Sequence, residues 1–116
     1  MAIGIPGIDE GIFNDLLDGD EELFVSLLTS FTNRTPSILS KLATVSKETL
    51  PDYANTVHGV KGACANVCAE EARKMAFSLE QKSRAGDLAG VLAENGPFLK
   101  YMEELIGKLK DWLKNH

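Results

Sequence analysis

The stretch Leu50–Ala69, LPDYANTVHGVKGACANVCA, decides the fold and contains the candidate site. Its larger apolar residues recur at spacings of four, three, four and three, which places them on one stripe of a helix: Tyr53, Val57, Val60, Cys64 and Val67. His58, Gly62 and Ala65 lie on the opposite side, and Lys61 lies at the border between the two faces. Small residues beside a histidine allow another macromolecule to approach it closely.

The chain before this stretch predicts two helices. Residues 1–8 form an extended lead, and Asp9 then caps a brief helix whose inward positions are Ile12, Phe13, Leu16 and Leu17. Asp20 caps a longer second helix, which continues to about Val45, and the apolar stripe of its first half is Leu23, Phe24, Leu27, Leu28 and Phe31. Pro36 removes one backbone donor and predicts a bend or a break near residues 32–36.

The chain after this stretch also predicts two helices. One begins at about Glu70 and ends at Ala85-Gly86-Asp87, where a glycine closes one helix and an aspartate caps the next. The last helix runs from Leu88 to Leu113, and its apolar positions include Val91, Leu92, Leu99, Met102 and Leu105. Asn95-Gly96-Pro97 predicts a kink or a split in it.

These patterns together predict an all-α fold. The sequence shows no strand pattern of any length, and short links join four substantial helices and one short N-terminal helix. We therefore expect an up-and-down four-helix bundle with a short additional N-terminal helix. At 116 residues the chain is expected to form one domain over residues 1–116, with its core at about 8–114.

Composition narrows the classes of function. The formal net charge is −5 at pH 7, so we expect neither a nucleic-acid groove nor an anionic membrane surface as partner. No apolar run approaches the ~18 residues that a membrane span needs, and the N-terminus lacks the pattern of a signal peptide. Two cysteines four residues apart fit a reducing compartment, and we expect a cytoplasmic monomer.

The motif His58-Gly59-Val60-Lys61-Gly62, followed by small residues and Asn66, resembles the histidine-containing phosphotransfer (HPt) domains of bacterial phosphorelays. The resemblance extends to Leu79-Glu80 and Arg84-Ala85-Gly86-Asp87, and with the N-terminal lead it covers about residues 6–113. It is closest in kind to the HPt domains of hybrid sensor histidine kinases. Cys68 departs from the family pattern, which usually has glycine at the turn that closes the central helix.

The resemblance implies a phosphorelay carrier without its own ATP site. His58 would accept a phosphoryl group from a receiver-domain aspartate and pass it to another receiver. A histidine of ordinary pKa, about 6.5, is mostly neutral near pH 7 and therefore nucleophilic. Lys61 would offset the phosphoryl charge, and Gly62 and Ala65 would keep the docking surface clear. Glu80 would accept a hydrogen bond from the other ring nitrogen.

The residues also allow plainer interpretations. His58, Lys61 and Glu80 are each compatible with an ordinary solvated side chain, and the domain is then a docking module that binds receivers without accepting phosphate. We expect no cofactor of the domain's own, and any Mg²⁺ should belong to the partner receiver. We expect no metal site either, because Cys64 lies on the buried stripe and His58 faces away from it. A histidine kinase and response-regulator receivers are the expected partners.

Overall fold

The computed structural model describes residues 4–116, and over that range it contains helices and no strand. The all-α prediction is thus confirmed. The first three residues of the predicted lead lie outside the described residues. The helices are α1 (Glu10–Leu17), α2 (Glu21–Leu42), α3 (Leu50–Asn66), α4 (Glu70–Arg84) and α5 (Leu88–Leu113).

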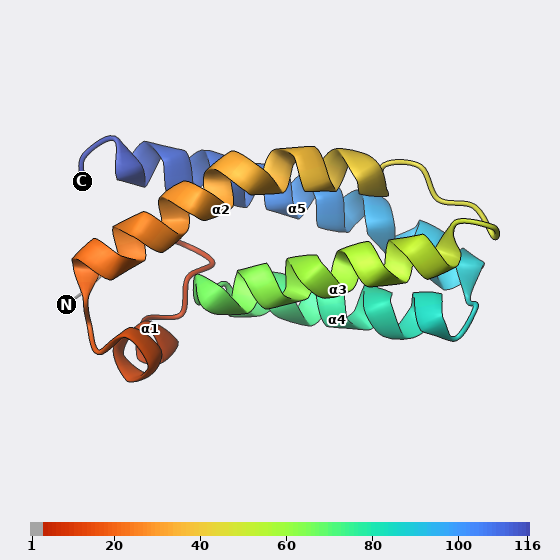
Figure 1. The fold of residues 1–116 in the computed structure, drawn as a ribbon, viewed down its shortest axis with the longest axis horizontal. Helices are drawn as coiled ribbons and strands as arrows, with labels where there is room; N and C mark the ends of the chain where they lie inside the picture. Colours follow the sequence, from red (N-terminus) through yellow and green to blue (C-terminus); the bar gives the residue numbers. More distant parts are fainter. Residues whose placement is uncertain (1–3) are drawn as a thin grey trace.

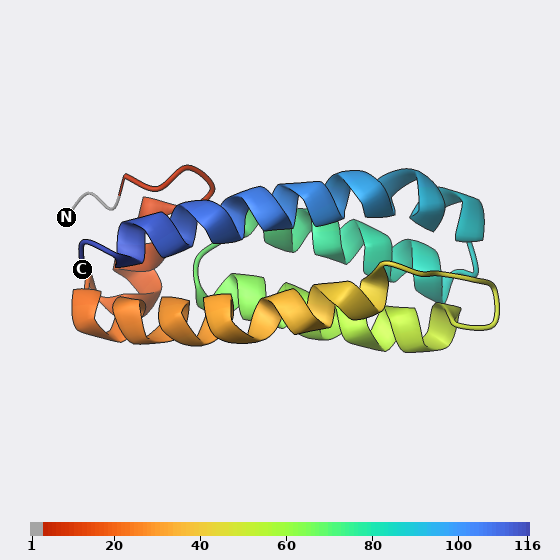
Figure 2. The ribbon, with the colours of Figure 1, turned by 90° about the horizontal axis from the view of Figure 1, so that it is seen from above.

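The four long helices lie lengthwise beside one another and run alternately in opposite directions (Figures 1 and 2). Both α2 and α4 pack against α3 and α5, so that α3 and α5 are diagonal neighbours across the molecule. The short α1 lies at the end where α2 begins and α5 ends (Figure 1). This arrangement leaves the outer face of α3 open to solvent along its length.

The predicted helix starts are confirmed by their caps. The Asp9 and Asp20 carboxylates accept hydrogen bonds from the backbone N–H groups of Ile12 and Leu23, three residues on, at 3.0 Å in each case. The α3 helix follows Thr49, with a proline in its first turn. Each cap satisfies or replaces a donor that the first turn of a helix leaves unpaired.

Neither of the two prolines breaks the helix on which it stands. The α2 helix is continuous through Pro36, and α5 is continuous through Pro97. Of the predicted bend or break near residues 32–36 the break was therefore wrong, and of the predicted kink or split at residues 95–97 the split was wrong. Each proline removes a single backbone hydrogen bond, and each is exposed, with its ring on the outside of the helix. The buried neighbours Thr35 and Phe98, 2% and 0% exposed, anchor the two helices to the core beside the missing bonds.

Three leucines predicted to face inward are exposed instead. Leu16, Leu23 and Leu92 are 67%, 44% and 55% exposed, respectively. Leu23 and Leu92 stand at the edges of their apolar stripes, beyond the rows that the neighbouring helices cover. Leu16 lies on α1, which packs only weakly against the other helices. By contrast, Phe24, Leu28 and Phe31 are buried in the core as expected.

The end of α3 has a backbone conformation that favours glycine at the position of Cys68. The Cys68 backbone is left-handed, with φ of 63°. Its N–H donates to the Ala65 carbonyl, and the Ala69 N–H donates to the Cys64 carbonyl at 2.9 Å. This is the pattern of a Schellman motif, whose left-handed position suits glycine best. The Cys68 carbonyl accepts a hydrogen bond from the Asp9 N–H at 2.8 Å, which ties the start of α1 to the turn.

None of the helices in residues 4–116 combines the length and the apolar character that crossing a membrane requires.

The apolar stripe of α3 faces the core, where Val57, Val60 and Cys64 are at most 1% exposed. These buried residues hold the helix firmly, and the residues between them are presented outward on a rigid support.

Candidate functional site

His58 stands on the outer face of α3, and its side chain is 59% exposed. Its neighbour Val57 and the following Val60 are buried, so the backbone that carries the imidazole is fixed while the ring itself meets solvent. The sequence-based assignment of His58 to the outer face is therefore confirmed.

The ring is held from the side by Glu80 of α4. His58 Nδ1 lies 2.9 Å from Glu80 Oε2, and Arg84 Nε donates to the same oxygen at 3.1 Å. The Lys61 ammonium lies 2.7 Å from the other carboxylate oxygen, Oε1, and forms an ion pair with it. The angles of this contact are not those of a hydrogen bond. Glu80 is only 7% exposed. The alternative of a solvated Glu80 carboxylate is thus wrong, since the group is buried among three basic partners.

These partners fix the protonation of Glu80 and the tautomer of the imidazole. The Lys61 ammonium, followed by Arg84 and His58, lowers the pKa of the Glu80 carboxyl to about 2 against the opposing effect of burial. Glu80 is therefore ionised at neutral pH and can only accept hydrogen bonds. Nδ1 must then carry the proton, and in the neutral ring Nε2 has the free lone pair. The structure thus places Glu80 against the ring nitrogen at which the sequence analysis expected it.

Lys61 is the second basic group beside His58. Its side chain is 24% exposed, in agreement with the predicted border position. Besides the ion pair with Glu80, its ammonium lies 5.3 Å from the centre of the Phe77 ring on α4. Phe77 was not noticed in the sequence, and Arg84 was noticed only as part of the family resemblance and not as a site residue. They stand three residues before and four residues after Glu80, on the same side of α4.

The surface beside the histidine is open. Gly62 is exposed. A Cβ added at Gly62 would meet no atom within 4 Å among the described residues, apart from those of its chain neighbours and of its own helix backbone. Its φ is not in the left-handed region, so the local backbone does not require glycine. Ala65 is half-buried one turn further on, which makes the cleared face narrower than the sequence alone indicates.

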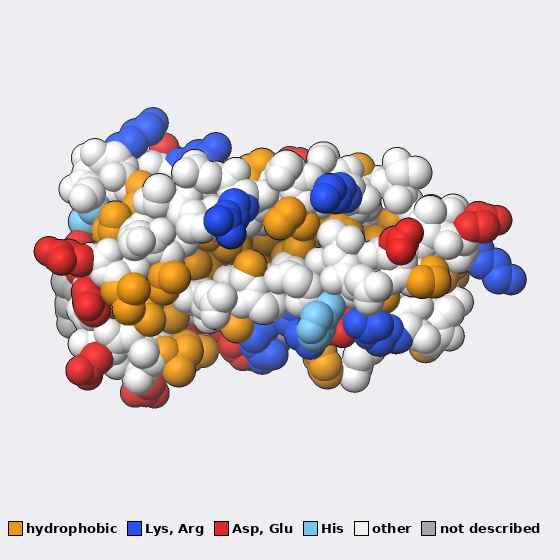
Figure 3. Space-filling model, viewed as in Figure 1, with side chains coloured by type: hydrophobic (Ala, Val, Ile, Leu, Met, Phe, Trp, Pro, Cys, Tyr) orange, Lys and Arg blue, Asp and Glu red, His pale blue; other side chains and the backbone are white. Residues whose placement is uncertain are grey.

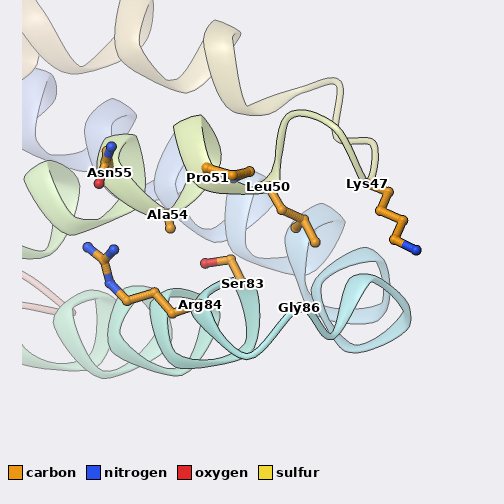
Figure 4. A pocket seen from close by; sticks show the side chains of 8 residues that line it. All are labelled: Lys47, Leu50, Pro51, Ala54, Asn55, Ser83, Arg84 and Gly86. Atoms are coloured by element: carbon orange, nitrogen blue, oxygen red, sulfur yellow. The ribbon is translucent and has the colours of Figure 1, made fainter.

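The site is a surface and not a pocket. On the face shown in Figure 3, basic side chains flank a histidine on the lower helices, and acidic side chains gather near the two ends. A groove of about 600 Å³ between α3 and α4 lies next to the site (Figure 4), and its lining includes Asn55 and Arg84. The imidazole itself stands outside that groove. An exposed nucleophile of this kind suits a macromolecular partner better than an enclosed small molecule.

The two cysteines take no part in this site. Cys64 and Cys68 are both free thiols and both buried. Burial raises the pKa of the Cys64 thiol to about 12, and burial with the nearby Asp9 charge raises that of Cys68. Within residues 4–116, no three His, Cys, Asp or Glu side chains converge as a metal site would require.

Comparison with protein families shows which family the chain matches. The family model of the Hpt domain matches residues 26–114, a range that contains most of α2 and all of α3, α4 and α5. The matched range includes His58, Lys61 and Glu80, whereas α1 lies outside it. No match was found among curated proteins or among solved structures.

Proposed function

The chain belongs to the Hpt domain family, whose members are phosphotransfer carriers that interact with receiver domains in phosphorelays, and from this premise we propose that His58 is the phosphoacceptor. In this proposal His58 takes a phosphoryl group from the aspartate of one receiver and passes it to the aspartate of another. The observation that carries the proposal is the geometry of the ring, since Nδ1 is tied to a buried carboxylate and Nε2 is left free.

The transfer follows from that geometry. The Nε2 lone pair attacks phosphorus, the bond from phosphorus to the aspartyl oxygen breaks, and the electron pair of that bond stays with the departing carboxylate. Nδ1 keeps its proton, so the ring becomes a cation while it carries the phosphoryl group. Glu80, 2.9 Å from Nδ1, stabilises this positive charge. The reverse reaction restores the neutral ring, and the same site can therefore donate.

The neighbouring residues have distinct proposed roles. Lys61 offsets negative charge on the phosphoryl group, and Arg84 helps to hold Glu80 in place. Gly62 and Ala65 keep the docking surface clear for a receiver. The transfer calls on no cofactor of this domain, and we expect the Mg²⁺ of the reaction to be held by the receiver.

We further propose that residues 1–116 form a single domain of the up-and-down four-helix type, with α1 as the additional N-terminal helix. The ring of contacts among the long helices supports this assignment. The free, buried thiols favour the cytoplasm as the location of the domain. We also propose that the domain is a monomer and that the relay begins at a histidine kinase. The alternative is a docking module that binds receivers without accepting phosphate.

The deciding experiment is transfer of a radiolabelled phosphoryl group from a kinase–receiver pair to the parent domain and to His58→Gln. We expect the parent domain to become labelled through a bond that acid cleaves and base leaves intact, as a phosphohistidine does. His58→Gln should remain unlabelled with its helical circular dichroism unchanged. Failure of several receivers to label a folded parent domain would overturn the carrier proposal and favour the docking module.

A further inference from the structure

Phe77 is an aromatic residue that the fold does not bury. It lies on α4 and is 43% exposed, whereas the core positions of the same helix, Ala76 and Leu79, are at most 1% exposed. Its ring centre is 5.3 Å from the Lys61 ammonium, within the range at which a cation is attracted to the face of an aromatic ring.

Lys61 therefore has two contacts on α4, one turn apart. Glu80 draws the ammonium toward the buried carboxylate, with 2.7 Å between Nζ and Oε1. Phe77, three residues earlier, provides a ring nearer the solvent. A lysine side chain has many rotamers, and it loses much of that freedom when it is held in one place. The two contacts hold the ammonium on the side of α3 where His58 stands.

The resting position of Lys61 poses a difficulty for transfer. Its ammonium is paired with Glu80 at 2.7 Å, and Nδ1 is the ring nitrogen that faces Glu80. A phosphoryl group on the other nitrogen, Nε2, would therefore lie further from Glu80 than the resting ammonium does. To reach it, the ammonium must move outward from Oε1. Without an aromatic surface on its outer side, the freed lysine would be hydrated and spread over many rotamers.

We propose that Phe77 is a positioning residue for phosphoryl transfer, whose ring holds the Lys61 ammonium beside His58 as it moves from Glu80 to the phosphoryl group. This inference rests on the proposed function. Phe77 acts through Lys61 and does not touch the reacting atoms. The competing explanation for an exposed aromatic residue, direct contact with the receiver, is an outcome of the test below.

The test compares Phe77→Leu with Phe77→Tyr in the intact chain. The phosphoryl donor is one phosphorylated receiver that is able to label the parent domain. Leucine keeps an apolar side chain and removes the ring, whereas tyrosine keeps the ring. We expect Phe77→Leu to lower the maximal transfer rate about two- to fivefold with little change in the receiver concentration at half-maximal rate. Phe77→Tyr should restore the rate. Leu92→Ala, at another exposed apolar residue, is the matched control on α5 and should leave the rate unchanged.

The same substitution in a Lys61→Met background separates positioning from docking. If Phe77 acts through Lys61, Phe77→Leu should add no further loss there, because the cation that it holds is gone. An equal loss in both backgrounds, or a rise in the half-maximal concentration alone, would show instead that Phe77 contacts the receiver. A normal rate for Phe77→Leu with an active parent would overturn this inference alone, whereas an inactive parent would overturn the proposed function.

Discussion

Replacing Glu80 with glutamine preserves the size of the side chain and removes the charge that three basic groups surround. Glu80 lies within 3.1 Å of His58, Lys61 and Arg84 and is 7% exposed. The Lys61 ammonium is the largest cause of the lowered pKa of this carboxyl, which is about 2 instead of the usual 4.5. The folded protein therefore binds a proton at this site less readily than the unfolded chain does. Glu80→Gln measures how much the ionised carboxylate contributes to the free energy of unfolding.

The size of the effect follows from that difference. Each pKa unit is equivalent to about 1.4 kcal/mol, so the difference between the pKa of 4.5 and that of about 2 corresponds to roughly 3 kcal/mol of folding free energy. The side chains of His58 and Arg84 are 59% and 49% exposed, and solvent screens their attraction to the carboxylate. We therefore expect about 1–2 kcal/mol. Because the pKa is lower in the folded state, this stabilisation is complete above the usual pKa of 4.5 and is lost as the pH falls toward about 2.

The assay is urea unfolding followed by circular dichroism at several pH values between about 7 and 2.5. At about pH 7 the Glu80→Gln variant should be about 1–2 kcal/mol less stable than the parent, because it lacks the ionised carboxylate. The gap should narrow steadily toward about pH 2.5, because the carboxyl of the unfolded parent is then protonated and the carboxyl of the folded parent begins to take up its proton. Glu103→Gln, at an exposed position of α5, is the control and should track the parent at every pH. A gap of constant size at all pH values would refute the electrostatic explanation.

Three further outcomes are expected. Gly62→Gln should raise the unfolding free energy by up to about 1 kcal/mol, because glycine is unfavourable within a helix and a Cβ meets no neighbour there. Radiolabel transfer to that variant should nevertheless fall at least about tenfold, since the longer side chain obstructs the receiver; undiminished transfer would show that the surface beside Gly62 is not part of the docking face. Cys68→Gly should be more stable than Cys68→Ala by about 1 kcal/mol in urea unfolding, since only glycine adopts φ of 63° without strain; equal stability would mean that burial of the Cβ offsets the strain. Both thiols should resist iodoacetamide in the native protein and react once guanidinium chloride unfolds it, because Cys64 and Cys68 are at most 1% exposed; labelling of the folded protein would show that this end of α3 opens.

Much of the fold was predictable because its helix boundaries depend on local chemistry. An aspartate that caps its own helix, as Asp20 and Asp87 do, needs only the backbone N–H groups two or three residues further on. The glycine at position 86, with φ of 75°, likewise closes α4 by its own backbone freedom. These signals lie within a few residues of one another, so the sequence alone contains them.

The errors arose where packing between helices decides the outcome. Pro36 and Pro97 are strong local signals for interruption, but the helices on which they stand are held on both sides of the proline by buried residues. Leu23 and Leu92 belong to apolar patterns whose edges remain uncovered. A periodic pattern shows which way a helix faces, and it does not show how wide a strip its neighbours cover.

The candidate site was predictable in part for the same reason. His58, Lys61 and Gly62 are placed by the turn of a single helix, and one helix can be inferred from its sequence. The ion cluster requires α4 to lie against α3 with Glu80 opposite His58, 22 residues earlier in the chain. That alignment depends on how the two helices pack. For this reason the role of Glu80 remained ambiguous in the sequence, and Arg84 and Phe77 were not assigned to the site.

The charges of the cluster explain how such a site can both accept and release a phosphoryl group. With the imidazole neutral, Lys61 and Arg84 contribute two positive charges and Glu80 one negative charge, so the resting site has one positive charge in excess. That excess attracts an anion to a domain whose formal net charge is −5. On the proposed chemistry, a phosphoryl group adds about two negative charges, and the ring gains one positive charge as Nδ1 keeps its proton. The loaded cluster is then close to neutral. A buried lysine in place of Glu80 would bind the phosphoryl group more firmly and hinder its release, whereas a second carboxylate would repel it. One carboxylate between two cations gives the balance that a carrier needs.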